Sequence, residues 1–430
     1  MKKIIFSILM MAVMVIPGVV LAAGEEAQIG SDKYATLEAA VTAATPGAEI
    51  TLLEDVDLTN TLVIEKNLTI NLNNHSISRA DTVLEVKGAT LSLTGNGAVT
   101  ETTPDYGAIV VRGSDNPNAT NYTVVNVGEG VKLTGWAGIN IQPVNKTDKP
   151  FAYGVVVNVN GDIVSLKDTL NGTGSGVYVN GYIQHTDNAP VINLNSTASI
   201  DSIGVGVYLA GFATLNVKGA TVVAEETAIG AKAGIITVED GSVLKAVGPD
   251  LTPTTSYGNG INPSGAAIQL ESNTGYAGKV KLNIKGGEIT SKNGYAIYEY
   301  LDSPNGTTTI EDISISGGDF SSAQGKDIFL VSDSFNETQK EFITGGTFSA
   351  DPSDYVNPEY VSKTENGDFV IGKPVENTPE KEPVKTDDAK KDNIENPETS
   401  DNILVSIALA SASLVAIVGY VVYNKKRSYN

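Results

Sequence analysis

The sequence contains no cysteine in its 430 residues, and this absence removes three kinds of chemistry. Without cysteine the protein has no disulfide, no thiolate metal site and no cysteine nucleophile. Histidine is almost as scarce, since His75 and His185 are the only two. With no third histidine and no glutamate at helical spacing from either one, a zinc site is not expected. We therefore interpret both histidines as structural residues of turns or loops.

Positive charge is also in short supply, because 29 lysines and arginines face 50 aspartates and glutamates, for a formal net charge of −21. Phosphate binding needs the opposite sign, so nucleic acid and anionic lipid are not expected as ligands. An acidic surface instead keeps an exported domain soluble. Asp162, Asp187 and Asp240 stand beside glycine or asparagine and could hold a surface calcium ion. No EF-hand spacing is present, however, and turn chemistry explains them at least as well, so we predict no metal and no cofactor.

Aromatic residues make up only 6% of the chain, whereas glycine is abundant, with 44 residues. This profile is typical of many short strands joined by turns. Two phrases recur along the chain and alternate from residue 206 onward. The first starts a strand with a small residue followed by Val or Ile: GVYVNG (176–181), GVYLAG (206–211), AIGAKAG (228–234), AIQLES (267–272), AIYEYL (296–301) and DIFLVS (327–332). The second is an alternating strand that ends in a glycine turn: LNVKGATV (215–222), ITVEDGSV (236–243), LNIKGGEI (282–289), ISISGGDF (313–320) and FITGGTF (342–348).

A repeat of this size cannot close a core alone and must stack on its neighbours. Apolar and polar residues alternate within each phrase, so one face of each strand points inward and the other points to solvent. The irregular period suits a parallel β-helix with turns of variable length. Looser segments that we count as further coils are 62–78, 83–95, 108–113, 124–135, 138–143 and 154–163. The sequence thus predicts an all-β parallel β-helix solenoid over residues 48–350.

A solenoid exposes its end coils and needs caps. Residues 31–47 are predicted to form an N-terminal cap helix, with Ser31 or Asp32 as its N-cap. Its apolar stripe would consist of Tyr34, Leu37, Val41 and Ala44. At the other end, residues 351–373 break the pattern and are predicted to form a closing hairpin around 365–367.

The two ends of the chain are typical of an exported, anchored protein. Residues 1–22 have two lysines, an apolar stretch and a small-x-small cleavage site, which indicates a signal peptide. Residues 374–402 are rich in proline and charge and lack aromatics, so we predict a disordered stalk. Residues 403–423 carry no charge and have the length of a transmembrane helix. The basic tail 424–430 follows and would stay cytoplasmic, which leaves the ectodomain outside.

Two segments resemble a known family. The stretch from YATLEAAVTAATPGAEITLLEDVDL to NLTINLNNHSIS (34–78), and the closing phrases ISGGDFSS and ITGGTFSADPSDYV, resemble right-handed parallel β-helix surface proteins of Gram-positive bacteria, the pectate-lyase-like family. The resemblance implies a right-handed coil and a scaffold. Enzymes of that family cleave polysaccharides, but their signatures Asn-Thr-Asp, Asp-Asp, Gly-His-Gly and Arg-Ile-Lys do not occur on the expected coils. The only Asp-Asp, Asp387-Asp388, lies in the stalk, and we predict no catalytic residue.

Two functions remain open from the sequence. The preferred one is a cell-surface adhesin or structural display scaffold that binds glycans or the surfaces of host or neighbouring cells. The alternative is a surface-attached polysaccharide lyase or glycoside hydrolase. If Val177 and Val207 point inward, Tyr178 and Tyr208 point outward in successive coils, with Tyr298 further along the same row. Stacked rings on an exposed strand face could bind sugar rings, although tyrosine is also simply a good strand residue.

The stalk ends in a motif that resembles the sorting signal of sortase transpeptidases, which join the threonine of the motif to peptidoglycan. Carried over, the recognition residues are Asn396, Pro397, Glu398, Thr399 and Ser400. The motif departs from the commonest pattern, Leu-Pro-x-Thr-Gly, at its first and last residues. If no sortase acts, the apolar span remains as a single-pass anchor with the same topology.

The resemblance predicts that the mature protein ends at Thr399 and is bound to the cell wall. Wall digestion followed by mass spectrometry should recover a C-terminal peptide that ends in Thr399 with a wall fragment attached. A mature protein that retains Tyr429-Asn430 would exclude the cleavage.

Overall fold

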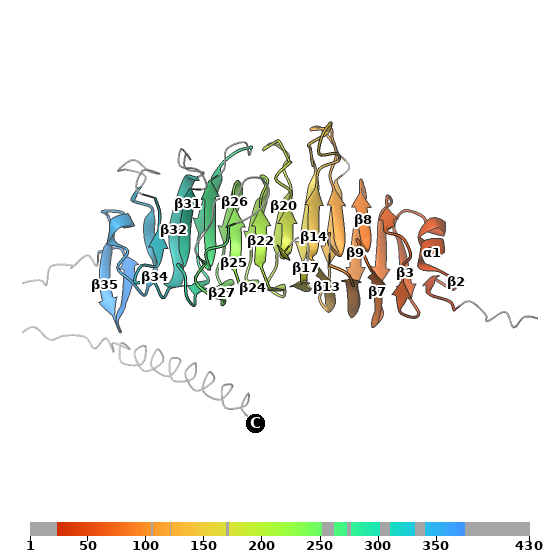
Figure 1. The fold of residues 1–430 in the computed structure, drawn as a ribbon, viewed down its shortest axis with the longest axis horizontal. Coiled ribbons are helices and arrows are strands. Elements are labelled where there is room, and N and C mark those ends of the chain that lie inside the picture. The colour runs from red at the N-terminus through yellow and green to blue at the C-terminus, as the bar shows by residue number, and fades with distance from the viewer. Residues whose placement is uncertain are drawn as a thin grey trace, which may run out of the picture. The chain divides into compact units, whose positions relative to one another are not determined.

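In the computed structural model, strands stack in parallel coil after coil (Figure 1). The chain divides into two compact units, Met1–Val375 and Glu376–Asn430, and every described residue lies in the first. The structure describes residues 24–104, 106–120, 122–168, 172–251, 262–272, 277–301, 310–331 and 340–374. The predicted signal peptide, the stalk beyond residue 374, the sorting motif Asn396–Ser400, the span 403–423 and the basic tail lie outside these residues. Within the described part, no helix is long and apolar enough to cross a membrane.

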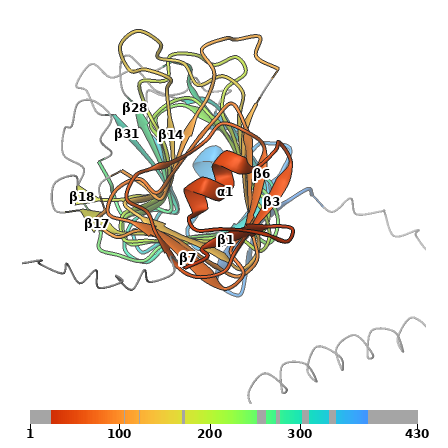
Figure 2. The same ribbon diagram turned by 90° about the vertical axis from the view of Figure 1, so that its right-hand side faces the viewer.

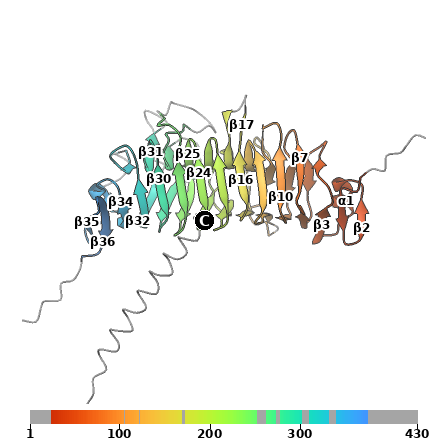
Figure 3. The same cartoon turned by 90° about the horizontal axis from the view of Figure 1, so that it is seen from below.

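Each complete coil contributes one strand to each of three faces, which we name A, B and C. Face A consists of β3 (Ala48–Leu52), β6 (Leu68–Asn71), β9 (Thr90–Thr94), β12 (Thr123–Val127), β15 (Val155–Val159), β20 (Val191–Leu194), β23 (Thr214–Val217), β26 (Gly234–Val238), β29 (Val280–Ile284), the first part of β32 (Ile310–Ser321) and β34 (Ile343–Phe348). Face B consists of β4 (Val56–Asp57), β7 (His75–Arg79), β10 (Gly97–Glu101), β13 (Val131–Gly135), β16 (Asp162–Ser165), β21 (Ser199–Ser202), β24 (Thr221–Ala224), β27 (Val243–Ala246), β30 (Glu288–Ser291) and the last part of β32. In Figure 3 the labelled strands β7, β10, β16, β24 and β30 of face B follow one another along the stack.

Face C is a separate parallel sheet. It consists of β5 (Leu62–Ile64), β8 (Leu84–Lys87), β11 (Ile109–Arg112), β14 (Ala137–Gln142), β19 (Ser175–Val179), β22 (Val205–Leu209), β25 (Thr227–Ala231), β28 (Ile268–Ser272), β31 (Ile297–Leu301) and β33 (Ile328–Phe329). A short antiparallel pair, β17 (Lys167–Asp168) and β18 (Gly172–Thr173), lies between β16 and β19 in the chain. The prediction of an all-β fold built from stacked parallel strands is confirmed.

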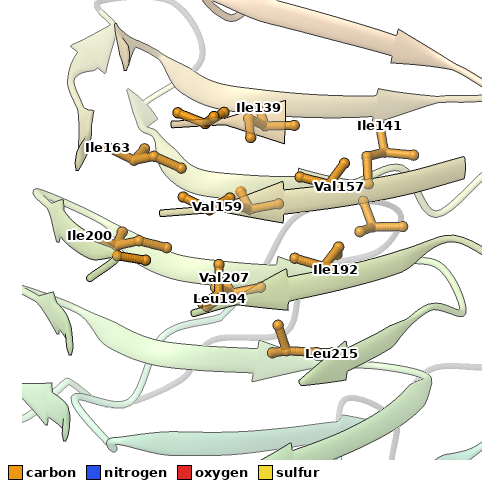
Figure 4. Close-up of a cluster of buried hydrophobic side chains, with 14 of the residues drawn as sticks. Ile139, Ile141, Val157, Val159, Ile163, Ile192, Leu194, Ile200, Val207 and Leu215 are labelled. Carbon is orange, nitrogen blue, oxygen red and sulfur yellow. The ribbon is translucent and has the colours of Figure 1, made fainter. Parts of the chain in front are cut away.

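The alternation of apolar and polar residues produces the core. On face A, Val157 pairs with Ile192 on the next coil, and Ile192 pairs with Leu215 on the one after. All three side chains are fully buried. Figure 4 shows these residues together with aliphatic side chains of faces B and C pointing into the space that the coils enclose. The inward rows of successive coils therefore form one continuous core, in which each coil buries the apolar side chains of its neighbours.

The outward positions of face A carry a ladder of amides. The Nδ2 atom of Asn126 donates to Ser92 Oγ at 3.0 Å, and Asn158 Nδ2 donates to Asn126 Oδ1 at 2.8 Å. Asn193 donates to Asn158 at 2.9 Å, and Asn216 donates to Asn193 at 3.0 Å. These bonds run between residues at equivalent positions of adjacent coils, and they hold the coils in the same register as the core does.

The N-terminal helix α1 (Leu37–Ala43) is shorter than the predicted 31–47. Its N-cap is Thr36, whose Oγ1 accepts from Ala39 N at 3.1 Å, and not Ser31 or Asp32. Residues Asp32–Tyr34 instead form β2, which pairs antiparallel with β1 (Ala27–Ile29), so Tyr34 does not belong to the helical stripe. Leu37 N donates to a Glu26 carboxylate oxygen at 2.8 Å, which fixes where the helix starts. Figure 2 shows α1 lying across the end of the coils.

At the C-terminal end, the 3₁₀ turn η2 (Ser353–Tyr355) precedes a hairpin of β35 (Val361–Glu365) and β36 (Asp368–Gly372). Its turn places Asn366 at φ 55° and Gly367 at φ 102°. Two successive residues with positive φ are characteristic of a tight hairpin turn, for which Asn-Gly is the favoured pair. β36 also pairs antiparallel with β34, so the hairpin follows directly on the last coil at the place where the sequence analysis expects a cap.

The core stack makes a matched pair of substitutions informative. Val157→Ala removes two buried methyl groups and should lower the free energy of unfolding by about 2–3 kcal/mol, from lost transfer energy and the cavity left behind. Val63→Ala is the control, because Val63 is 46% exposed and its loss should cost less than about 0.5 kcal/mol. Urea unfolding followed by circular dichroism measures both. Equal losses would contradict the inward assignment of Val157.

Candidate functional site

The outward row of face C is the candidate site that the sequence indicates. Tyr178 pairs with Tyr208, Tyr208 with Gly230, Gly230 with Gln269, and Gln269 with Tyr298. Val177 and Val207, their chain neighbours, are fully buried in the core. Since successive side chains of a strand point to opposite faces, this row points outward. The predicted register is therefore confirmed.

In the middle of the stack, the tyrosines of this row are buried and not exposed as predicted. Tyr178 is only 8% exposed and Tyr208 only 3%. The Tyr178 ring packs edge-on against Trp136, with ring centroids 5.7 Å apart, and lies 5.8 Å from the Tyr208 ring. Trp136 and the neighbouring small residues cover the two rings in a second apolar cluster outside the coil. Tyr178 and Tyr208 thus do not lie on the exposed strand face on which sugar stacking was predicted.

Tyr298 lies in a more open setting. It is half-buried, and its ring stacks on Tyr295 at 5.4 Å and on Phe329 at 5.5 Å between centroids. Phe329 continues the row, since it pairs with Tyr298 in register, and it is 38% exposed. We call Tyr295, Tyr298 and Phe329 the aromatic patch. Burial raises the pKa of the Tyr298 phenol, so this group stays neutral.

Sequence reasoning missed two members of the aromatic patch. Phe329 occupies the row position of the phrase DIFLVS and was predictable by extending the register by one coil. Tyr295 precedes β31, and its sequence position carries no periodic signal.

A buried polar cluster lies on the outer side of face C, between the Tyr178–Tyr208 pair and the aromatic patch along the stack. It consists of Lys232, Asn262, Gln269 and Glu271, none of them more than 4% exposed. Lys232 Nζ lies 3.2 Å from Glu271 Oε1, and both side chains are fully buried. Burial raises the pKa of the Glu271 carboxyl, while the Lys232 charge and hydrogen bonds from Asn262 and Lys232 oppose the rise.

Other buried acids hold the backbone in place. The Glu101 carboxylate accepts from the backbone N–H groups of Tyr106, Gly107 and Trp136 at 2.8, 3.1 and 2.8 Å. Asp327 accepts from Ser349 Oγ at 2.7 Å and from Ala350 N at 2.8 Å, and burial raises its pKa. Both carboxylates join a strand to a neighbouring turn.

Among the described residues, no group of three or more His, Asp or Glu side chains could hold a metal ion. Asp162, Asp187 and Asp240 are all exposed and lie on different coils.

The two histidines have different environments. His185 is 5% exposed, and its ring lies 3.9 Å from the Tyr153 ring between centroids. Its Nε2 accepts from Ala152 N at 3.0 Å, so Nδ1 carries the proton and donates to Asp187 O at 3.0 Å. Burial lowers the pKa of His185. His75 is half-buried, with Nδ1 3.7 Å from Asp55 Oδ1.

The chain matches no protein-family model, no curated protein sequence and no solved structure.

His185 predicts an acid-sensitive contribution to stability. Because burial lowers its folded-state pKa below the ordinary value of 6.5, the unfolded chain binds the proton more readily. The stabilisation is thus complete above about pH 6.5 and is lost as the pH falls through the folded-state pKa. Urea unfolding of the wild type and of His185→Gln, at intervals from pH 7.5 to about 4.5, should give a stability difference that shrinks on acidification. His75→Gln is the control for loss of a histidine elsewhere in the coils, and it should retain the acid-dependent loss of stability that His185 causes. Parallel profiles for wild type and His185→Gln would contradict the prediction.

Proposed function

We propose that this protein is a surface adhesin or display scaffold that binds glycans or neighbouring cell surfaces through the aromatic patch. The observation that carries the proposal is the stacking of Tyr298 on Tyr295 and Phe329 at an accessible part of face C. Rings with an apolar face and a polar edge suit sugars, whose ring C–H groups pack on the aromatic face while hydroxyls bond at the edge. Tyr178 and Tyr208 are buried under Trp136 and take no part in the proposed binding.

The ends of the chain supply the proposed location. The signal peptide at 1–22, the motif around Thr399, the apolar span and the basic tail together support export and sortase-mediated attachment to the peptidoglycan of a Gram-positive bacterium. The stalk would hold the coils away from the wall. Sortase and peptidoglycan are thus the proposed partners in attachment, and the net charge of −21 argues against nucleic acid.

The finer family assignment is part of the same proposal. Parallel strands of one sheet joined by crossover connections form right-handed units in nearly all proteins. The parallel pairing of all three faces therefore favours a right-handed, pectate-lyase-like coil. A polysaccharide lyase or hydrolase would follow from fold analogy alone. We do not propose it, because no specific arrangement of side chains in the described coils favours that chemistry.

Removing the aromatic patch should abolish recognition without unfolding the coils. Tyr298→Ala should weaken binding of the purified protein to its best-bound polysaccharide on a glycan and peptidoglycan panel by about tenfold, roughly 1.4 kcal/mol. Phe329→Ala should act in the same direction. Tyr122→Ala is the matched control, because Tyr122 is 46% exposed and lies outside the row. Binding that survives both patch substitutions, or no binding to any panel member or bacterial surface, would refute the proposal.

A further inference from the structure

Three side chains of the buried polar cluster form an arrangement that neither the core nor the aromatic patch uses. Ala231 pairs with Leu270, so Lys232 and Glu271 are the next residues along neighbouring strands, on the outer side of face C. Asn262 comes from the segment that precedes β28. Their exposed fractions are 1% for Lys232, 0% for Glu271 and 4% for Asn262. An amine, a carboxamide and a carboxyl group thus share one enclosed space.

The carboxyl group lies between the other two. Glu271 Oε1 is 3.2 Å from Lys232 Nζ and accepts from Asn262 Nδ2 at 3.1 Å. Its second oxygen, Oε2, accepts from the backbone N–H of Asn262 at 3.2 Å, which holds the asparagine in place. Gln269 Nε2 donates to Oε2 at 3.4 Å. The Gln269 carboxamide thus contacts a different oxygen from the one that lies 3.2 Å from Lys232 Nζ. Asn262 is therefore the carboxamide that shares an oxygen with the lysine.

Burial brings the carboxyl group of this cluster closer to its protonated form. A buried ion pair is costly, because both charges lose their hydration and only part of that cost returns as mutual attraction. Transfer of one proton from the lysine to the glutamate gives a neutral amine beside a neutral carboxylic acid. Burial raises the pKa of Glu271, which acts in this direction. The result is a nucleophile and a general acid next to a carboxamide.

We propose that Lys232 and Asn262 form an intramolecular isopeptide bond, and that Glu271 is the catalytic residue that moves the protons. The geometry that carries this proposal is the single oxygen Oε1 in contact with both reacting groups. It is independent of the function of the aromatic patch.

The reaction balances without an external reagent. The neutral Lys232 Nζ attacks Cγ of Asn262, and the protonated Glu271 carboxyl donates a hydrogen bond and then its proton to the carboxamide. The Nζ–Cγ bond forms and the Cγ–Nδ2 bond breaks. The leaving nitrogen takes the proton from Glu271 and one proton from Nζ passes back to the carboxylate, so that ammonia departs. No atom changes oxidation state.

The bond would close a ring in a chain that has no disulfide. Asn262 lies in the connection between β27 and β28, and Lys232 lies at the end of β25 on the preceding coil. A cross-link between them ties this connection to the outer face of the sheet. It would restrict the unfolded chain as a disulfide does, and it cannot be reversed by reduction.

The mass of the folded full-length protein, recovered from the cells that produce it, tests the bond. Each intact species should weigh less than its sequence by one ammonia. Trypsin should then fail to cut after Lys232 and yield one branched peptide, residues 219–245 joined to residues 246–279. Fragmentation should locate the branch at Lys232 and Asn262. Cleavage after Lys232 in the folded protein would overturn the proposal, and a branch at Gln269 would overturn the assignment of Asn262.

Variants test the role of Glu271. Glu271→Gln keeps the size of the side chain but cannot shuttle a proton, so the full mass and the cut after Lys232 should return. Lys232→Met should also restore the full mass. Lys245→Met is the matched control, because Lys245 forms an exposed ion pair with Glu288 at 2.9 Å, and it should keep the cross-link. A cross-link that persists in Glu271→Gln would refute the role of Glu271. The wild-type peptide map decides the bond itself, even where a variant fails to fold.

Discussion

The structure depends on the in-register stacking of inward aliphatic side chains between coils. The row Val125, Val157, Ile192 and Leu215 has one member per coil, and every member is fully buried. One coil alone encloses too little apolar surface to be stable, so its stability comes from the coils on either side. The ends consequently need cover, which α1 and the hairpin of β35 and β36 supply. A chain without cysteine can rely on this arrangement because its free energy of unfolding grows with each added coil.

The same register also aligns the outward side chains of successive coils. Once the inward rows are aligned, the outward residues of successive coils must also align, whatever their chemistry. On face A this produces the amide ladder, in which Asn193 both donates to Asn158 and accepts from Asn216. On face C it produces in turn a covered pair of tyrosines, a buried polar cluster and an aromatic patch. The stacking of coils thus fixes where outward side chains lie, and the sequence decides which chemical groups occupy those positions.

The sequence could predict the features that follow from local periodicity. The strands, their register and the outward direction of Tyr178, Tyr208 and Tyr298 all follow from a period of two residues. The burial of Tyr178 could not be predicted, because it depends on Trp136, which belongs to the preceding coil. The start of α1 could not be predicted either, because it depends on a contact outside the helix. Glu26 accepts from the N–H of Leu37, and the antiparallel pair of β1 and β2 lies between these two residues in the chain. The signal peptide and the sorting motif remain predictions.

The outer face of one sheet supports two different kinds of chemistry, and burial separates them. The strands β14, β19, β22 and β25 are buried on both faces, so groups there exchange little with solvent. In such surroundings an ion pair is costly to keep, and the proposed bond between Lys232 and Asn262 would remove the lysine charge. Toward β31 and β33 the cover thins and Phe329 reaches solvent, so aromatic groups there are available to a ligand. Lys232, Asn262 and Glu271 escape sequence analysis because their spacings of 30 and 9 residues match no motif. The stacking of coils brings Lys232 beside Glu271 and Asn262 of the next coil, so the cluster has no signature in the local sequence.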